Sequence, residues 1–214
     1  MKWSEEAWNA AAEIYDRILA LPFVKELAAG TLSRERFQFY IGQDSMYIDN
    51  YSRVLAHVGS RMPRKEWMED FLRFASDGIA VEKALHEFYL TGHDTDSLRP
   101  SPTCLLYNSY EAAKAMAPVE VEAASILPCF WVYQRVGESI MRECAEGNPY
   151  TRWIETYGDE GFAESNRRAI EICDGLAEGA SPEVRAQMTE AFVMSTRMEW
   201  MFWDSAYRME QWPV

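Results

Sequence analysis

Apolar side chains recur every three or four residues along most of this 214-residue chain, which is the spacing of amphipathic helices. Residues 33–58 illustrate the pattern, because Phe37, Ile41, Tyr47 or Ile48, and Tyr51 fall at helical spacing. Alternation with a period of two, which would indicate strands, is nearly absent. The pattern therefore predicts an all-α protein.

Start and stop signals divide this pattern into separate helices. Ser4, Ser33 and Ser181 are expected N-caps, because a serine hydroxyl can accept a hydrogen bond from the first turn. Pro182 suits the first position of the last helix, and Gly30 is expected to end the second. The first expected helix follows Ser4, and the others cover residues 22–30, 33–58, 64–90, 103–117, 119–145, 160–180 and 181–207, with a shorter one within 148–160.

The connections between these segments are short, and the chain contains no linker, internal repeat or low-complexity tract. Helices that are joined by short loops pack as antiparallel neighbours. A chain of this length can also bury a sizeable core. We therefore expect one compact antiparallel helical bundle, a single domain that spans residues 1–214.

Composition narrows the class of protein. Hydrophobic residues make up 48% and charged residues 26%, as in soluble globular proteins, and the formal net charge is −13. An acidic surface repels phosphates, so neither nucleic acid nor an anionic membrane is an expected partner. No secretory signal and no membrane-length apolar run is present, and the four irregularly spaced cysteines lack a C-x-x-C motif. These features favour reduced thiols in the cytoplasm.

Histidine-based metal sites find little support in the sequence. A ferritin-type di-iron site needs Glu-x-x-His on two helices, whereas Glu82 and His86 are four residues apart and have no second copy. His57 and His93 lie outside any such motif, and the alternative for Glu82 and His86 is a helical surface pair. A haem could use one histidine, but no other feature favours haem.

The segment "SILPCFWVYQRVG" places a proline directly before Cys129 in an apolar helix. Pro128 removes one backbone N–H, so the helix is expected to bend and turn the thiol toward a cavity. Tyr133 follows one turn later on the same face, whereas Phe130 and Trp131 lie off that face and are expected to pack against neighbouring helices. From these residues alone, Cys129 is either a small core residue or a nucleophile.

Two acidic residues lie among aromatic neighbours. Asp44 stands within "QFYIGQDSMYIDNY", and Glu199 stands within "STRMEWMFWD". Burial of an acid requires a partner or a task, and desolvation would raise the pKa of Glu199 and suit it to proton transfer. The alternative is that both acids point to solvent while the aromatic residues face inward. The 14% aromatic content, with eight tryptophans, fits either a bulky core or a pocket for flat rings.

The chain resembles the thiaminase II (TenA) family, whose members have the haem-oxygenase-like all-helical fold. The segments that carry the resemblance are "PFVKELAAGTLSRERFQFYIGQDSMY", "KALHEFY", "SPTCLLYNSY", "ILPCFWVYQRVGE", "YTRWIETYG" and "MEWMFWDSAYR". They run along nearly the whole chain, in the family's order and spacing. The retained Cys129 indicates the cysteine-bearing branch.

The resemblance implies a role for each matching residue. Cys129 matches the nucleophile, Glu199 the acid that exchanges a proton with the substrate, and Asp44 the carboxylate that binds an aminopyrimidine. Tyr47 matches a tyrosine that supports the reactivity of the thiol. The remaining pocket residues implied by the resemblance are Tyr107, Tyr133, Tyr157 and Phe202.

The resemblance also implies an activity. Members of this branch hydrolyse 4-amino-5-aminomethyl-2-methylpyrimidine to its hydroxymethyl counterpart and ammonia, and many cleave thiamin, in thiamin salvage. They usually form homotetramers and need no metal or cofactor. The alternative that the residues leave open is a non-catalytic carrier of pyrimidine or thiamin.

Overall fold

The structure, a computed structural model, describes residues 1–91, 98–158 and 160–214, apart from the side chain of Glu82. The described residues form helices and no strand, so the predicted all-α class is confirmed. The helices are α1 (Trp3–Leu19), α2 (Pro22–Ala28), α3 (Arg34–Arg61), α4 (Lys65–Tyr89), α5 (Pro102–Ala113), the 3₁₀ helix η1 (Lys114–Met116), α6 (Val119–Glu143), α7 (Thr151–Gly158), α8 (Glu160–Gly179) and α9 (Pro182–Arg208).

Two of the three predicted serine caps are confirmed. The hydroxyl of Ser33 accepts a hydrogen bond from the backbone N–H of Arg36 at 3.3 Å, at the start of α3. Ser181 accepts one from the N–H of Val184 at 3.3 Å, at the start of α9. Each hydroxyl satisfies a first-turn donor that has no partner within its own helix, and this fixes where the helix begins.

The prediction for Ser4 was wrong. Helix α1 begins at Trp3, one residue earlier, and Asp174 of α8 supplies the acceptor at this end. The Asp174 carboxylate accepts hydrogen bonds from the backbone N–H of Ser4 at 2.8 Å and from its hydroxyl at 2.9 Å. A carboxylate is a stronger acceptor than a hydroxyl, so a residue 170 positions away replaces the local cap.

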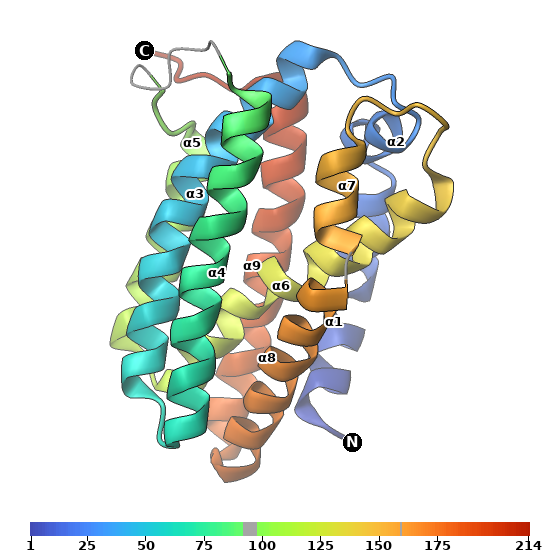
Figure 1. The fold of residues 1–214 in the computed structure, drawn as a ribbon. Helices are drawn as coiled ribbons and strands as arrows, with labels where there is room; N and C mark the ends of the chain where they lie inside the picture. The colour runs from blue at the N-terminus through green and yellow to red at the C-terminus, as the bar shows by residue number, and fades with distance from the viewer. Residues whose placement is uncertain (92–97, 159) are drawn as a thin grey trace.

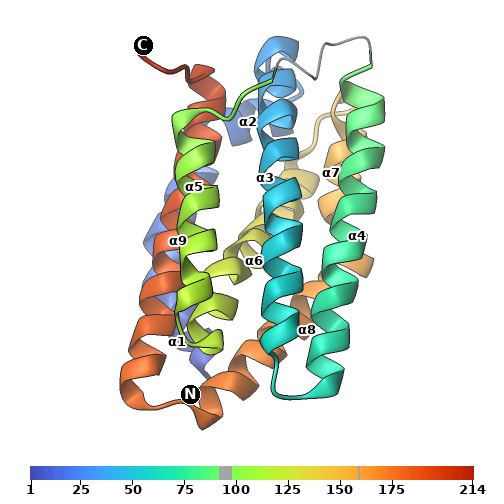
Figure 2. The ribbon, with the colours of Figure 1, turned by 90° about the vertical axis from the view of Figure 1, so that its left-hand side faces the viewer.

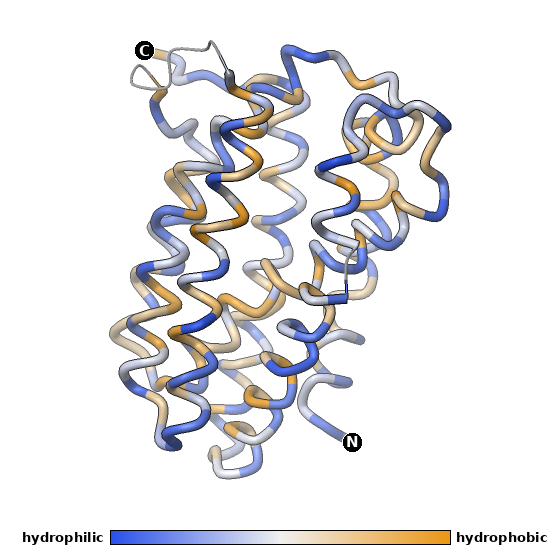
Figure 3. Tube along the Cα trace, in the orientation of Figure 1, coloured by the Kyte–Doolittle hydropathy of each residue, from blue (hydrophilic) through white to orange (hydrophobic). Residues whose placement is uncertain are grey.

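The helices pack as an elongated bundle with the two termini at opposite ends (Figures 1 and 2). Helices α3 and α4 form an antiparallel pair. On the side of α3 that faces away from α4, α5 packs against both α3 and α9. Helix α6 packs along α9, with α1, α7 and α8 beside them. Figure 3 shows apolar and polar positions alternating turn by turn along the helices, as amphipathic packing requires.

Aromatic side chains fill much of the core. Trp203 of α9 is fully buried and stacks on Tyr40 of α3, with ring centroids 5.1 Å apart and an angle of 10° between the planes. Its ring also lies 5.3 Å from that of Phe23 and 5.1 Å from that of Tyr133. Bulky core packing therefore explains part of the high aromatic content.

Helix α6 continues through Pro128. The Tyr51 hydroxyl of α3 donates a hydrogen bond to the carbonyl of Ile126 at 2.8 Å, two residues before the proline. This contact ties α3 to the turn of α6 that carries Cys129. Within the described ranges, no helix is both long and apolar enough to cross a membrane.

Candidate active site

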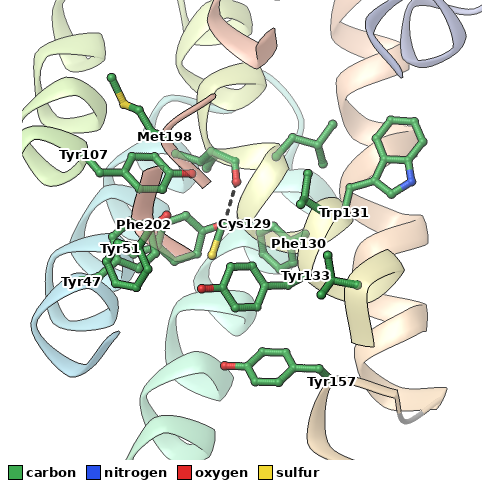
Figure 4. Close-up of a cluster of buried hydrophobic side chains, with 14 of the residues drawn as sticks. Tyr47, Tyr51, Tyr107, Cys129, Phe130, Trp131, Tyr133, Tyr157, Met198 and Phe202 are labelled. Atoms are coloured by element: carbon green, nitrogen blue, oxygen red, sulfur yellow. Dashed lines mark hydrogen bonds between the residues drawn. The ribbon is translucent and has the colours of Figure 1, made fainter. Parts of the chain in front are cut away.

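A cavity of about 320 Å³ lies between α3, α4, α6, α7 and the first turns of α8. Four of the predicted site residues line it, namely Asp44, Cys129, Tyr133 and Tyr157. The other lining residues are Ile48, Tyr51, Leu55, Phe74, Asp77, Gly78, Val81, Phe130, Thr156, Gly161, Phe162 and Ser165. The remaining predicted residues, Tyr47, Tyr107, Glu199 and Phe202, are buried but do not line the cavity. Figure 4 shows Tyr47, Tyr107 and Phe202 on one side of the thiol. The structure therefore brings all eight together from five helices.

Cys129 lies in the wall of the cavity and among buried phenols (Figure 4). Burial raises the pKa of the Cys129 thiol well above its usual value, and the nearby carboxyls of Glu199 and Glu111 add to the rise. The nearby Tyr47 hydroxyl acts in the opposite direction, because it favours the thiolate. The thiol is placed to meet a ligand, and it needs a proton acceptor before it can act as a nucleophile.

Glu199 is buried on α9, so the alternative that it points to solvent is wrong. Its Oε1 atom accepts a hydrogen bond from the Tyr107 hydroxyl at 2.7 Å. Burial raises the pKa of Glu199 to about 8, the Tyr107 hydrogen bond opposes this shift, and the charge of Asp44 adds to it. At neutral pH the carboxyl therefore holds a proton that it can donate.

Asp44 is also buried, with 4% of its surface exposed, and it lines the cavity from α3. Tyr133 and Tyr157 form a wall of the cavity together, with their ring centroids 5.3 Å apart. The Tyr133 hydroxyl also lies 3.4 Å from that of Tyr40. Phenol rings at this spacing can contact a flat heterocycle while their hydroxyls reach its polar edge.

A third buried carboxyl, Glu111 of α5, was not predicted. It is fully buried, and its Oε1 atom accepts a hydrogen bond from the Tyr47 hydroxyl at 3.0 Å. Burial raises the pKa of Glu111 well above its usual value, and the Tyr47 hydrogen bond opposes this rise. The sequence did carry a signal, because Glu111 follows Tyr107 by four residues and so shares its helix face.

The two tyrosine–glutamate pairs are neighbours. The rings of Tyr47 and Tyr107 lie 4.7 Å apart between centroids, and the Phe202 ring lies 5.8 Å from that of Tyr47. Phe202 thus packs against the phenols and is not part of the cavity lining. The arrangement combines one thiol, three buried acids and aromatic walls, which is a constellation suited to covalent chemistry on a flat ring.

Comparison with known proteins identifies the family. Residues 8–209 match the TENA/THI-4/PQQC family. The chain belongs to this family. It is 35% identical over 219 residues to an aminopyrimidine aminohydrolase of Bacillus subtilis, which covers 99% of this chain and 92% of the relative. The predicted membership of the TenA family is thereby confirmed.

Solved structures show the same fold. A TenA homologue from P. horikoshii aligns with a TM-score of 0.86 at 23% identity, over 97% of this chain and 99% of that one. A domain of unknown function with a heme oxygenase-like fold from Shewanella denitrificans aligns with a TM-score of 0.75 at 16% identity, over 98% and 93% of the two chains. The predicted haem-oxygenase-like fold is therefore confirmed.

The structure corrects the prediction for Phe130, a residue next to Cys129 in the cavity wall. Phe130 was expected to pack against neighbouring helices and not to face the cavity. In the structure, Phe130 lines the cavity, and its ring centroid lies 5.3 Å from that of Phe74 and 5.9 Å from that of Tyr51. The reason is that the cavity extends along α4, which lies on the Phe130 side of α6. Trp131 does pack away, against Trp8 at 4.7 Å between ring centroids.

None of the described residues that line the cavity is a histidine. Nδ1 of His57 lies 2.7 Å from Oε1 of the buried Glu122, which also pairs with Arg61. His86 is half-buried beside a separate hollow, while His93 and the side chain of Glu82 lie outside the described residues. Over residues 1–91, 98–158 and 160–214, no three His, Cys, Asp or Glu side chains gather closely enough to hold a metal ion.

Proposed function

We propose that this chain is an aminopyrimidine aminohydrolase in which Cys129 is the covalent nucleophile. The observation that carries the proposal is the position of the Cys129 thiol in the cavity wall, beside Asp44 and with the proton-bearing Glu199 close to it. The similarity to the Bacillus subtilis aminopyrimidine aminohydrolase along the whole chain supports the same function. The substrate is 4-amino-5-aminomethyl-2-methylpyrimidine, with thiamin as a second substrate.

Substrate binding uses the carboxylate and the aromatic wall. Asp44 accepts a hydrogen bond from the 4-amino group of the pyrimidine, and its negative charge strengthens this bond. Tyr133 and Tyr157 contact the flat ring. Tyr107 holds Glu199 in place through its hydrogen bond, and Phe202 holds Tyr47 in place through the contact between their rings. The cavity of about 320 Å³ is large enough for a single heterocycle of this kind.

The reaction proceeds through a covalent adduct. The Cys129 thiolate adds to a ring carbon, and Glu199 gives its proton to a ring nitrogen, so that no charge accumulates on the ring. The proton that the thiol gives up goes to the amine, and the ring electrons then expel this amine from the exocyclic methylene as ammonia. When thiamin is the substrate, the leaving group is the thiazole. Water adds to the methylene, the carbon–sulfur bond breaks, and Glu199 recovers its proton. The net change replaces the amino group by hydroxyl with consumption of one water.

The wider setting is part of the proposal. The reaction would return degraded thiamin to the biosynthetic route, which is a salvage role in the cytoplasm. The assembly that we expect is a homotetramer, and exposed apolar side chains on α5 and η1, among them Leu105, Leu106 and Met116, offer a surface for it.

Replacement of the nucleophile tests the proposal. Purified protein is incubated with the aminomethyl pyrimidine, and ammonia and the hydroxymethyl product are measured. Cys129→Ala should lose at least about 10³-fold in kcat/KM, because no other group can form the adduct. Cys144→Ala is the matched control and should retain full activity, since Cys144 is a free thiol outside the cavity.

Normal turnover by Cys129→Ala would rule out the nucleophile assignment. A carrier protein would give a different result, since the pyrimidine would raise the melting temperature of the wild-type chain while no product formed. Product analysis with thiamin beside the aminomethyl pyrimidine then ranks the two substrates.

A further inference from the structure

The cavity has more room than the aminomethyl pyrimidine needs. Its volume is about 320 Å³, and pockets of about 300 Å³ and more commonly hold drug-sized ligands. The aminomethyl pyrimidine is smaller than these, because it is a single ring with short substituents. A second ring attached to the pyrimidine therefore fits in the same cavity.

The lining residues become more exposed toward one end of the cavity. Asp44, Cys129 and Tyr133 are buried. Val81 has 41% of its surface exposed, and Asp77 is exposed as well. A leaving group departs toward solvent, so it lies at this end when the pyrimidine is held at Cys129. We call this end the outer part of the cavity, and it is lined by Asp77, Gly78 and Val81 on α4 and by Gly161, Phe162 and Ser165 on α8.

We propose that the outer part of the cavity binds a flat, positively charged leaving group and that Asp77 selects for its charge. The substrate class is aminopyrimidines whose exocyclic methylene carries an aromatic cation, and the thiazolium ring of thiamin is one such cation. The inference rests on the proposed function only for the position of the pyrimidine at Cys129.

Helix α4 presents one face to the outer part. Phe74, Asp77, Gly78 and Val81 are spaced by three, one and three residues, so they share a face of the helix. A Cβ atom at Gly78 would meet the Ser52 hydroxyl oxygen at 3.8 Å, which is an ordinary contact. Packing against α3 thus does not require glycine at this position. The missing side chain instead widens the cavity beside Asp77.

Asp77 carries a charge that no described side chain neutralises. Its carboxylate takes part in no ion pair and no hydrogen bond among the described residues. Asp70 of the same helix differs, because it pairs with Arg73 and Arg168. The Asp77 carboxylate is therefore available to a positively charged ligand.

Aromatic side chains extend from the thiol to the outer part. Phe130, the residue after Cys129, stacks with Phe162 of α8, with ring centroids 6.5 Å apart and an angle of 21° between the planes. Phe162 also meets the Tyr157 ring edge-on, at 5.4 Å between centroids. The face of an aromatic ring attracts a cation. A flat cation can therefore lie against Phe162 while its charge faces Asp77.

The other charges around the outer part also favour a cation. No Lys, Arg or His is among the described residues that line the cavity. The first turn of α8 lies at the outer part, and its backbone N–H groups carry a partial positive charge. Glu160 and Glu164 share the single cation Arg167, so these three side chains keep one net negative charge that offsets the helix end.

Cleavage removes the charge that Asp77 recognises. The bond between the methylene carbon and the thiazolium nitrogen breaks, and its electron pair stays on the nitrogen, so the thiazole departs uncharged. Asp77 therefore binds the intact substrate more tightly than the departing ring, and it does not favour the transition state over the substrate. Loss of this carboxylate should raise the KM for thiamin but should not lower kcat.

Ligand binding to a chain that cannot turn over tests the proposal. In a Cys129→Ala background, calorimetry measures the dissociation constants of thiamin and of the hydroxymethyl pyrimidine at low and high salt. Addition of Asp77→Asn should weaken thiamin binding at least about threefold at low salt and less at high salt, because the exposed carboxylate is screened. The hydroxymethyl pyrimidine carries no charged leaving group, so its dissociation constant should stay within about twofold.

Glu69→Gln is the matched control. It also removes one negative charge from an exposed position on α4, but Glu69 pairs with Lys65 at 3.5 Å and does not line the cavity. It should leave both dissociation constants unchanged, and Asp77→Glu should retain the binding of thiamin. Equal effects of Asp77→Asn and Glu69→Gln on thiamin would overturn the proposal. So would equal weakening of both ligands by Asp77→Asn, or no binding of thiamin at all.

Steady-state kinetics with Cys129 intact give a second readout. Asp77→Asn should raise the KM for thiamin without lowering kcat, and a fall in kcat at constant KM would contradict the assigned role. Since binding needs no turnover, the leaving-group site can fail while hydrolysis of the aminomethyl pyrimidine stands. A chain that forms no product but binds thiamin in an Asp77-dependent way would overturn the proposed function and leave the site in place.

Discussion

Single side chains in this protein gain their chemistry from partners far away in the sequence. Glu199 holds its proton because it is buried, and its carboxyl accepts a hydrogen bond from Tyr107, which lies 92 positions earlier in the chain. Tyr47 meets Glu111 across 64 positions. The spacing along one helix could place Asp44, Tyr47 and Tyr51 near one face, but it could not name the residues opposite them, because pairing between helices has no local signature.

Glu199→Gln should lower kcat by about 10²-fold, because the ring nitrogen loses its proton donor while the shape of the site is kept. The wild-type rate should fall above about pH 8, as the pKa of Glu199 is passed. The pH profile of kcat for both proteins checks this. If Glu199→Gln kept the wild-type pH profile of kcat, Glu199 would not be the proton donor.

The same substitution has a stability consequence whose sign is fixed by the direction of the pKa shift. Burial raises the pKa of folded Glu199 to about 8, from an ordinary value of 4.5. The folded chain keeps a proton that the unfolded chain loses, so the stabilising contribution is complete below about pH 4.5 and declines as pH rises toward 8. Relative to the wild type, Glu199→Gln should gain melting temperature between pH 5 and pH 8. A difference that did not change with pH would contradict the buried, proton-bearing state.

At the scale of elements, the cavity depends on how closely α7 approaches α6. Gly137 of α6 lies against Tyr157 of α7, and a Cβ atom at position 137 would be 2.9 Å from the Tyr157 carbonyl oxygen and 3.0 Å from its Cβ atom. The absence of a side chain at Gly137 therefore lets α7 bring Tyr157 to the cavity wall.

Gly137→Ala should push α7 outward, lower stability by about 1–3 kcal/mol and raise KM, because overpacking outweighs the helix propensity gained by alanine. Thermal unfolding and steady-state kinetics measure both effects. Gly179→Ala is the matched control, since no described atom beyond its chain neighbours and its own helix backbone lies within 4 Å of its Cβ position, and it should leave melting temperature and KM almost unchanged. Equal behaviour of the two variants would contradict this account of α7.

Helix boundaries followed the sequence closely where the signal is local. The Ser33 and Ser181 caps and Pro182 lie where we expected them, because a cap involves only the next three residues. Ser4 shows the limit of such signals, since the acceptor at that helix end comes from Asp174 of α8. Phe130 shows it too, because its exposure to the cavity depends on where α4 packs.

Charge acts at the scale of the whole molecule. The chain carries a formal net charge of −13, and the cavity lining includes Asp44 and Asp77. A cationic substrate is therefore drawn toward the cavity, while an anionic one is repelled.

The phosphate ester of thiamin should consequently be a poor substrate. Its kcat/KM should be at least about tenfold below that of thiamin at low salt, and the gap should narrow as added salt screens the repulsion. Product formation from both compounds at two ionic strengths checks this. Equal rates at low salt would show that the acidic lining does not select against anions.

Local patterns in the sequence were enough to predict the all-α class, most helix ends and the presence of acids and a thiol within aromatic segments. These properties arise from interactions within a few residues, namely helical periodicity and capping. The packing of the helices against one another was needed to show that Glu111 faces Tyr47, that Phe130 lines the cavity and that Asp174 accepts hydrogen bonds at the start of α1. Each of these depends on which helices pack together and at what rotation, which no single helix encodes.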